Sequence, residues 1–381
     1  MKIEKKSWSA KDDWKPSVPG ELGERADLVL VFASTAIMRR HDFFDEIKKA
    51  YPKARLLGCS TSGEIMSDRV CDDTLVLTAV HFEKSHLKGA RMQIEKMEDS
   101  YRIGQALSGK FEHDGLRHIF VLSDGLNVNG SELVKGLAEG LPEGVTITGG
   151  LSGDGADFKE TFVMLDEPPA RNIVAAVAFY GPALRIGYGS MGGWDPFGPE
   201  RVITKSKGNV LYELDNKSAL ELYKKYLGEH AKGLPATGLL FPLSLRGENQ
   251  DKETGIVRTI LAIDEKEQSM TFAGDMPEGA FAQLMKANFD RLIDGAKGAA
   301  KTSAQPLSTA NAQLAVLISC VGRKLILKQR VEEEVEAVHE VLGKKVAYTG
   351  FYSYGEISPF TPNAQCELHN QTMTITTFAE E

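Results

Sequence analysis

The sequence lacks the features that define several large classes of protein. Its four cysteines (Cys59, Cys71, Cys320 and Cys366) lie far apart and form no CxxC pair, so we expect neither a disulfide framework nor a zinc knuckle. The longest apolar run, Ile173–Tyr180, is far shorter than the roughly 18–20 residues that cross a bilayer. The basic N-terminus has no apolar segment after it and does not resemble a secretory signal. We expect a cytoplasmic protein with no membrane partner.

Positive charge is also scarce. The chain has 45 Lys and Arg residues against 53 Asp and Glu residues, a net charge of −8, and it contains no run rich in Lys or Arg. Nucleic-acid-binding proteins usually carry a basic patch, so we expect no nucleic-acid partner. The eight histidines form no HxxxH or HExxH pair, which gives no support to a zinc hydrolase. Hydrophobic residues make up 42% of the 381 positions, enough for a packed core in two or three domains.

One layout occurs three times along the chain: an apolar strand, an amphipathic helix, a second strand and a glycine-rich loop. The first strands begin at Leu28, Ile119 and Leu314, and the loop glycines follow 30, 30 and 36 residues later. The loops read GCSTSGEI, GGLSGDG and GFYSYGEI (residues 58–65, 149–155 and 350–357). A βαβ unit pairs its strands in parallel under one helix. The repeats therefore predict an α/β fold in which βαβ units form two related α/β domains with mixed, largely parallel sheets.

Changes in composition suggest where the domains divide. Near Asp215 a strand-like segment gives way to SALELYKKYLG, in which Ser218 and Glu221 have the spacing of a capping box. A boundary there gives an N-terminal extension and two α/β domains at residues 1–23, 24–215 and 216–381. The stretch 295–313 has no aromatic residue and is rich in Ala, Ser, Thr and Lys, which predicts a flexible surface loop.

The glycine-rich loops are the first candidates for a ligand site. Each leaves the carboxyl end of a strand, where open α/β sheets place their ligand crevices, and glycine lets backbone N–H groups approach a ligand. A single loop of this kind is usually a plain turn, but three in register favour a shared crevice. The candidate ligand-binding residues in these loops are Cys59, Ser60, Thr61, Ser62, Glu64, Ser152, Tyr352, Ser353, Tyr354 and Glu356.

Three residues outside the loops are further candidates. Arg323 follows the first strand of the third unit, where a guanidinium suits bidentate capture of a carboxylate; a salt bridge to Glu332–Glu334 is its alternative, structural role. His369 precedes a terminal strand, where a histidine can be the single axial ligand of a haem iron; a hydrogen-bonded structural histidine is the alternative. Asn370 stands beside it as a further ligand-binding candidate. No metal other than a haem iron at His369 is expected.

Cysteine chemistry is the enzymatic alternative. Cys59 and Cys320 end corresponding strands of two repeats, a placement that suits paired thiols in a racemase or thiol transferase. A free cysteine is more often a small buried hydrophobe, and no histidine lies close in sequence to activate either thiol. We therefore expect a protein that is not an enzyme.

Six motifs occur in order along the chain: GCSTSGEI, TGGLSGDG, PATGLLFPLSL, SCVGR, GFYSYGEI and LHNQT. They resemble the FIST family of sensory proteins, with its N-terminal and C-terminal FIST domains, over residues 27–378. The resemblance implies an intracellular sensor that binds a small ligand. Together with the repeats, it leads us to expect a non-enzymatic protein whose ligand lies in a crevice between two α/β halves. It also implies a separate signalling partner, such as a histidine kinase or a cyclic-nucleotide enzyme.

The two FIST-like domains account for nearly the whole chain, so we expect no fused output domain. In this the chain resembles the NosP subgroup, which implies haem as cofactor and nitric oxide sensing. The alternative ligand is a small polar metabolite such as an amino acid. The Phe and Met content suits the apolar slot of a haem, whereas Arg, Glu and Ser suit a polar pocket, and the sequence leaves both open.

Overall fold

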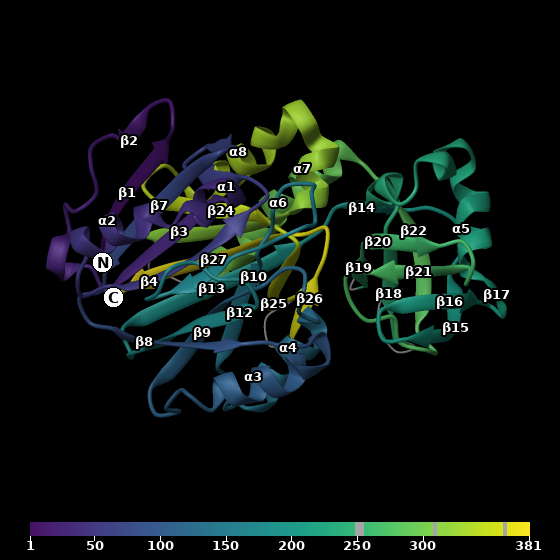
Figure 1. Ribbon diagram of the computed structural model, residues 1–381, viewed down its shortest axis with the longest axis horizontal. Coiled ribbons are helices and arrows are strands. Elements are labelled where there is room, and N and C mark those ends of the chain that lie inside the picture. Colours follow the sequence, from purple (N-terminus) through teal and green to yellow (C-terminus); the bar gives the residue numbers. More distant parts are fainter. Residues whose placement is uncertain (248–254, 308–310, 361–363) are drawn as a thin grey trace.

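The computed structural model describes residues 1–247, 255–307, 311–360 and 364–381. The chain forms a larger part, which we call the body, and a smaller part, which we call the lobe (Figure 1). The lobe comprises residues 194–287, and the body is formed by the residues before 192 and after 288. Because the chain leaves the body once and returns to it once, the lobe is an insertion.

The body contains three six-stranded sheets. Their strand orders are β11-β4-β3-β7-β1-β2 for the first, β26-β25-β10-β9-β12-β8 for the second and β13-β27-β23-β24-β5-β6 for the third. Each sheet holds one parallel pair from the three repeats: β3 (Leu28–Ser34) with β4 (Arg55–Thr61), β9 (Leu116–Ser123) with β10 (Thr146–Leu151), and β23 (Leu314–Cys320) with β24 (Ala347–Ser353). The sheets are mixed, as expected. Within the described ranges the other pairs are antiparallel, so the sheets are less parallel than the repeats indicated.

The three repeats interlock by exchanging strands. After β4 the chain crosses to the third sheet as β5 (Glu64–Met66), which pairs with β24. After β24 it crosses to the second sheet as β25 (Gly355–Pro359), which pairs with β10. After β10 it crosses to the first sheet as β11 (Val163–Leu165), which pairs with β4. The three units therefore close into a ring with approximate threefold symmetry.

The remaining body strands are β1 (Lys2–Ser9), β2 (Asp13–Lys15), β6 (Arg69–Cys71), β7 (Thr74–His81), β8 (His86–Gln93), β12 (Ile173–Tyr180), β13 (Leu184–Met191), β26 (Cys366–His369) and β27 (Met373–Glu380). The body helices are α1 (Thr35–Arg40), α2 (Asp42–Ala50), α3 (Ser100–Ser108), α4 (Gly130–Glu139), α6 (Phe289–Ala304), α7 (Val321–Leu327) and α8 (Val331–Leu342). No helix in the described ranges is both long and apolar enough to span a bilayer. β1 pairs with β7, so the N-terminal segment is part of the first sheet.

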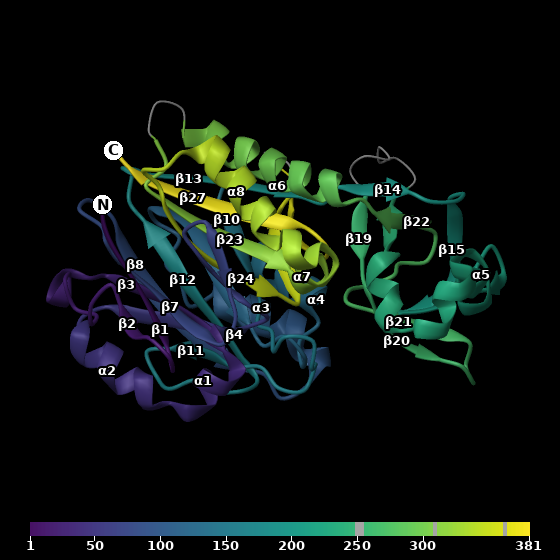
Figure 2. The same ribbon diagram turned by 90° about the horizontal axis from the view of Figure 1, so that it is seen from above.

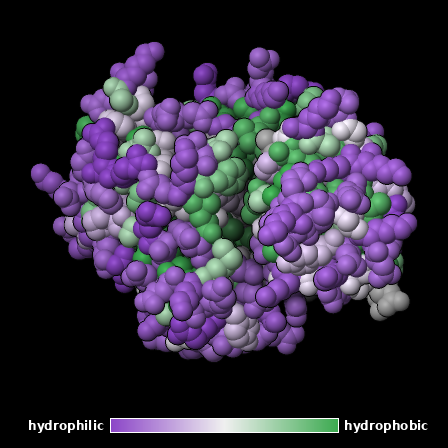
Figure 3. Space-filling view, turned by 45° about the vertical axis from the view of Figure 1, so that its right-hand side comes forward, coloured by the Kyte–Doolittle hydropathy of each residue, from purple (hydrophilic) through white to green (hydrophobic). Residues whose placement is uncertain are grey.

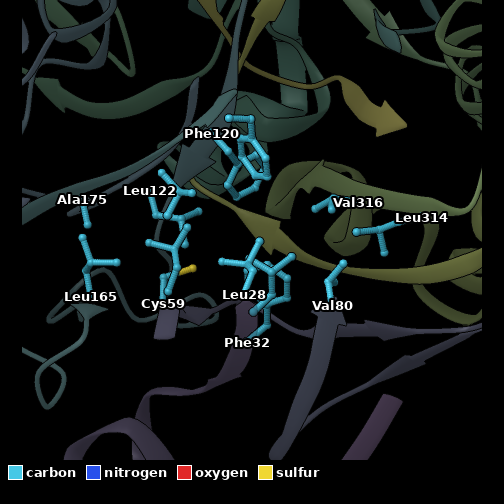
Figure 4. Close-up of a cluster of buried hydrophobic side chains, with 14 of the residues drawn as sticks. Leu28, Phe32, Cys59, Val80, Phe120, Leu122, Leu165, Ala175, Leu314 and Val316 are labelled. Atoms are coloured by element: carbon cyan, nitrogen blue, oxygen red, sulfur yellow. The ribbon is translucent and has the colours of Figure 1, made fainter. Parts of the chain in front are cut away.

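One apolar core lies where the inner faces of the three sheets meet. Figure 4 shows Leu28, Phe120 and Leu314, one from each sheet, within a single cluster of buried side chains. The rings of Phe32 and Phe351 join the first and third sheets at a centroid distance of 4.7 Å. The alternate residues of each strand face outward and are covered by helices: α1 and α2 on the first sheet, α3 and α4 on the second, and α6 and α8 on the third (Figure 2).

The stretch 295–313, predicted as a flexible loop, is mostly helical. Residues 295–304 belong to α6 and a 3₁₀ turn follows at Gln305–Leu307, while residues 308–310 lie outside the described ranges. The prediction was wrong because a stretch that lacks aromatic residues and is rich in Ala, Ser, Thr and Lys is not necessarily flexible. Its small residues instead form the buried face of a helix, and alanine is the strongest helix former. Ala296, Ala299 and Ala300 are fully buried against the third sheet.

In its described residues, the lobe is built on a nine-stranded sheet with one α-helix. Its strands are β14 (Trp194–Pro196), β15 (Arg201–Lys207), β16 (Val210–Leu214), β17 (Lys217–Ser218), β18 (Leu243–Arg246), β19 (Ile256–Arg258), β20 (Ile260–Asp264), β21 (Ser269–Phe272) and β22 (Phe281–Ala287). The helix α5 (Ala219–Leu227) begins at Ser218, whose hydroxyl accepts the Glu221 backbone N–H at 3.2 Å. β16 and β17 pair with each other, so Asp215, where we expected the domain boundary, lies inside the lobe.

Candidate functional site

The three predicted glycine-rich loops lie together in the body, and we call this region the loop junction (residues 58–65, 149–155 and 350–357). The first residues of each, including the leading glycine, belong to β4, β10 and β24 and not to a loop. Ser62 N–H donates to the Tyr352 carbonyl, and Tyr352 N–H donates to the Gly63 carbonyl, each at 2.8 Å. Gly153 N–H donates to the Ser60 carbonyl at 3.0 Å. The loops are therefore bound mainly to one another.

The predicted ligand-binding side chains of the loop junction are enclosed. At most 3% of the surface is exposed in Cys59, Ser60, Thr61, Ser62, Glu64, Ser152, Tyr352, Ser353, Glu356 and the neighbouring Asn370. Ser152 Oγ donates to the Ser123 carbonyl at 2.9 Å, and Asn370 Nδ2 donates to the Tyr354 carbonyl at 3.5 Å, whereas Asn370 Oδ1 is buried without a hydrogen-bond partner. Of the predicted residues, Tyr354 lines a cavity, described below. In this conformation the loop junction is a packed structural feature.

Glu64 is one of two buried carboxyl groups at the loop junction. It accepts hydrogen bonds from the Thr61 hydroxyl, the Thr74 N–H at 3.1 Å and the Thr74 hydroxyl at 2.6 Å. Burial raises the pKa of Glu64 to about 7, and the hydroxyl donors oppose that rise. The carboxyl ties its loop to the start of β7.

Glu356 occupies the equivalent position in the third repeat. It accepts hydrogen bonds from the Ser353 hydroxyl, the Thr372 N–H at 3.2 Å and the Thr372 hydroxyl at 3.0 Å. Burial raises the pKa of Glu356 to about 8, again opposed by its donors. The Ser/Thr-x-x-Glu pattern of the sequence therefore corresponds to two equivalent sets of hydrogen bonds, in each of which a buried glutamate joins its own segment to a threonine elsewhere in the chain. Neither carboxyl faces an open crevice.

Arg323 does not bind a ligand carboxylate in this structure; it forms the salt bridge named as its alternative role. Its guanidinium is fully buried, and Nε and Nη2 donate to Glu334 Oε2 at 2.9 and 2.7 Å. Nη1 donates to the Gly192 carbonyl and Nη2 to the Leu292 carbonyl, each at 2.7 Å. Four of the five N–H groups of Arg323 are used, a carboxylate already neutralises its charge and the side chain is 0% exposed, so the ligand role is not the one observed in this conformation. The reason is that α7 turns the side chain into the body.

His369 does not fit the role of an axial haem ligand. It is 1% exposed, and its Nε2 lies 2.8 Å from the Ser358 carbonyl, which makes Nε2 the protonated nitrogen of a neutral ring. Burial lowers the pKa of His369 to about 4. Among the described residues no three His, Cys, Asp or Glu side chains are grouped as metal ligands. The hydrogen-bonded structural role is the one observed.

The two cysteines proposed for catalysis are also enclosed. Cys59 is fully buried and Cys320 is 3% exposed. Burial raises the pKa of both thiols above the ordinary value, so both stay protonated. Because the thiolate is the nucleophile, neither side chain has the environment of a reactive cysteine.

A cavity of about 860 Å³ lies between the body and the lobe, and we call it the interlobe cavity. The body contributes α4, residues 141–147 and β26, and the lobe contributes Ile256 and Arg258 of β19. The charged residues of its wall are Lys135, Glu139, Glu143, Arg258 and Glu367. Sequence reasoning missed this wall, because Lys135 and Glu139 look like the solvent face of a helix.

Arg258 is the most unusual residue of the interlobe cavity. It is 5% exposed, and it reaches from the lobe to the body, where Nη1 donates to the Leu368 carbonyl at 2.8 Å and Nη2 to Ser131 Oγ at 3.5 Å. Nε donates to the Asp275 carbonyl at 3.3 Å. All three acceptors are neutral, and no carboxylate of the described ranges forms an ion pair with it. Burial lowers the pKa of Arg258 to about 10, opposed by the charges of Glu367 and Asp275, so it stays cationic.

A second, smaller hollow of about 100 Å³ also lies between body and lobe, and we call it the apolar cleft. Figure 3 shows a groove between the two parts with apolar residues along it. Met97, Phe158 and Leu261 line the cleft, although each is about 40% exposed (41%, 40% and 43%). The Phe158 ring stacks on Tyr354 at 4.4 Å, and Asp154 accepts the Phe158 N–H at 2.9 Å. Tyr354 thus connects the loop junction to the cleft.

Comparison with known proteins places the chain in a family. The FIST N domain matches residues 27–217 and the FIST C domain matches residues 219–359. The chain therefore belongs to the FIST family, whose domains sense small ligands. An uncharacterized protein of Methanocaldococcus jannaschii is 24% identical over 376 residues, which cover 87% of this chain and 70% of that protein.

A solved structure, the cyanuric acid hydrolase of A. caulinodans, aligns with 100% of this chain and 98% of its own, at 8% identity and a TM-score of 0.39. At this level of similarity nothing about the activity of this chain follows.

Proposed function

We propose that this protein is a non-enzymatic sensor that binds a small ligand in the interlobe cavity. The observation that carries the proposal is that body and lobe both build the wall of this cavity. A ligand that contacts both parts stabilises one position of the lobe relative to the body. Binding therefore shifts the population of conformations toward that position. The volume of about 860 Å³ lies within the range of small-molecule sites, roughly 300–1,000 Å³. Membership of a ligand-sensing family supports the proposal.

The wall favours a polar metabolite over haem. Arg258 forms no direct ion pair in the described ranges, although Glu367 and Asp275 lie near enough to act on its charge, and it reaches Ser131 in the first turn of α4. Its remaining N–H groups therefore suit a ligand carboxylate. Glu139, Glu143 and Glu367 on the same wall suit an amine. A small molecule with both groups, such as an amino acid, fits this pattern. Haem-based nitric oxide sensing finds no support in His369, whose Nε2 is already bonded.

The signal would pass to a separate cytoplasmic partner, such as a histidine kinase or a cyclic-nucleotide enzyme, that reads the position of the lobe. The FIST family membership supports a signalling role.

A thermal-shift screen tests the ligand site. Amino acids and small carboxylates are compared with the matching amides, and compounds that raise Tm are titrated by calorimetry. Arg258→Gln should weaken the best carboxylate by about 10- to 100-fold, since a charge-assisted hydrogen bond is worth roughly 1.5–3 kcal/mol. Arg102→Gln on α3, where the side chain is 71% exposed, is the matched control and should leave binding unchanged. Equal affinities in the two variants would remove Arg258 from the site.

Haemin added to the purified protein tests the competing ligand. We expect no defined absorption band that depends on His369. A sharp band that shifts on reduction and is lost in His369→Ala would favour haem over the polar metabolite.

A further inference from the structure

The lobe is joined to the body by two short connections that lie close together. The chain enters the lobe after β13 through Gly192 and leaves it after β22 at Asn288, which caps α6. Arg323 of α7 donates to the Gly192 carbonyl on the entry connection and to the Leu292 carbonyl in the first turn of α6, directly after the exit connection, each at 2.7 Å. A single guanidinium therefore binds the entry connection and the start of the helix that follows the exit connection.

The guanidinium is itself anchored in the body. Glu334 of α8 is 0% exposed and binds Arg323 through Oε2. The other oxygen, Oε1, accepts the Ser319 hydroxyl at 3.0 Å and the Tyr352 hydroxyl at 2.7 Å. A buried ion pair is maintained when its geometry is good and its remaining atoms are hydrogen-bonded, and both conditions hold here.

This network also reaches the loop junction. Tyr352 is the residue that exchanges backbone hydrogen bonds with Ser62 and Gly63 of the first loop. An unbroken chain of contacts thus runs from the loop junction through Tyr352 and Glu334 to Arg323, the entry connection and the start of α6. Near the entry, the Trp194 indole donates to the Gln371 carbonyl at 3.0 Å, which gives the connection a second attachment to the body.

We infer that Arg323 is a positioning residue: it clamps both connections of the lobe and couples the position of the lobe to the loop junction. Since the lobe contributes Arg258 and Ile256 to the interlobe cavity, the clamp also sets the shape of that cavity. This last consequence rests on the proposed function, whereas the clamp itself does not depend on any ligand.

Hydrogen exchange measured by mass spectrometry on the full chain tests the clamp. The variant Arg323→Met with Glu334→Met removes both charges together and avoids the unpaired charge that a single change leaves buried. Peptides covering residues 186–196 and 286–296 should exchange faster by a factor on the order of ten, with residues 28–34 of β3 unchanged. Equal exchange at the connections, or a uniform increase that includes β3, would overturn the inference.

A matched ion-pair control lies within the lobe. Arg201 Nη1 donates to Asp215 Oδ2 at 2.8 Å, and this pair touches neither connection. Arg201→Met with Asp215→Asn should leave the exchange of both connections unchanged. Faster exchange at the connections in this control would show that the response is not specific to Arg323, and would count against the clamp.

Two tyrosine variants test the coupling even if the double methionine variant does not fold. Tyr352→Phe removes the hydroxyl that binds Glu334, whereas Tyr348→Phe removes the hydroxyl of a tyrosine that is also 0% exposed and that binds the Gly343 carbonyl at 2.8 Å. Only Tyr352→Phe should speed exchange at the two connections. Identical exchange in the two variants would overturn the coupling.

The affinity of the best carboxylate from the screen separates the clamp from the ligand site. The double methionine variant should loosen the connections and also change this affinity. Loosened connections with unchanged affinity would keep the clamp and contradict the ligand site. Unchanged connections with altered affinity would keep the ligand site and contradict the clamp.

Discussion

Polar side chains from distant parts of the chain gather at two places, the loop junction and the interlobe cavity. At the loop junction, Glu64 and Glu356 are bound by hydroxyl and N–H groups of their own chain, and the loops bind one another. At the interlobe cavity, Arg258 contacts only neutral acceptors in the described ranges, and about 860 Å³ remains beside it. The difference shows that polar composition alone does not make a ligand site. Open volume and a charged group that is not held in a direct ion pair are also needed.

The glycines of the loop junction have a structural explanation. A Cβ atom at Gly350 would lie 1.9 Å from the Leu317 carbonyl oxygen of β23, and one at Gly149 would lie 1.8 Å from the Val121 carbonyl oxygen of β9. Neither distance is possible for a side chain. The repeated glycine is therefore required by the close approach of the parallel strand beside it, which is the same in each repeat.

The largest expected effect is a difference in the free energy of unfolding between variants of the two buried arginines. Arg323→Met leaves the Glu334 carboxylate buried without its cation and should lower the free energy of unfolding by about 3–5 kcal/mol. Arg258→Met removes a buried cation whose partners are neutral, and should cost only about 1–3 kcal/mol. Urea unfolding of both variants at pH 7 measures the two values. Equal losses would contradict the contrast between a paired charge and one without a carboxylate partner.

The pH dependence of stability should reveal the carboxyls of the loop junction. The pKa values of Glu64 and Glu356 are raised by burial from 4.5 to about 7 and about 8, so the folded protein holds protons that the unfolded chain releases first. The contribution of these two carboxyls to the free energy of unfolding should therefore be fully present below about pH 4.5. It should be lost as the pH rises toward 8, by on the order of 1–3 kcal/mol for each group.

Glu64→Gln combined with Glu356→Gln isolates this effect. The double variant keeps the hydrogen-bonding shape but cannot ionise, so its stability should fall less than that of the wild type between pH 5 and pH 8. Urea unfolding at both pH values measures the two slopes. Parallel slopes would show that these carboxyls are already ionised in the folded protein.

The smallest expected effect concerns the cap of α4. The Asn129 side chain accepts the Glu132 N–H at 3.2 Å and donates to Asp275 of the lobe at 3.0 Å. Asn129→Ala should cost about 1 kcal/mol and also weaken ligand binding, because Asn129 joins body and lobe. Ser218→Ala removes a cap inside the lobe at a similar cost and should leave binding unchanged. Thermal unfolding and titration of both variants check this, and equal affinities would separate Asn129 from the ligand site.

Much of the local structure could be predicted from the sequence. The strands beginning at Leu28 and Leu314 were found from their apolar runs, and the cap at Ser218 from its spacing to Glu221. These features depend on residues close to each other in the chain. The helix α6 was not predicted, because small alanine side chains give only a weak apolar pattern in the sequence. That these alanines form a buried face is seen only where the helix packs against the third sheet.

The sequence by itself determined the three βαβ units, the glycine in the second strand of each unit and the lack of a long apolar run. The tertiary structure decided which polar residues are hydrogen-bonded within the packed interior and which line a cavity. Arg323 and Arg258 are both buried arginines, yet one meets Glu334 and the other lines the interlobe cavity. The physical reason is that a cavity and an ion pair are formed by residues far apart in the chain. Their distances are set only when the lobe is inserted and the three sheets close.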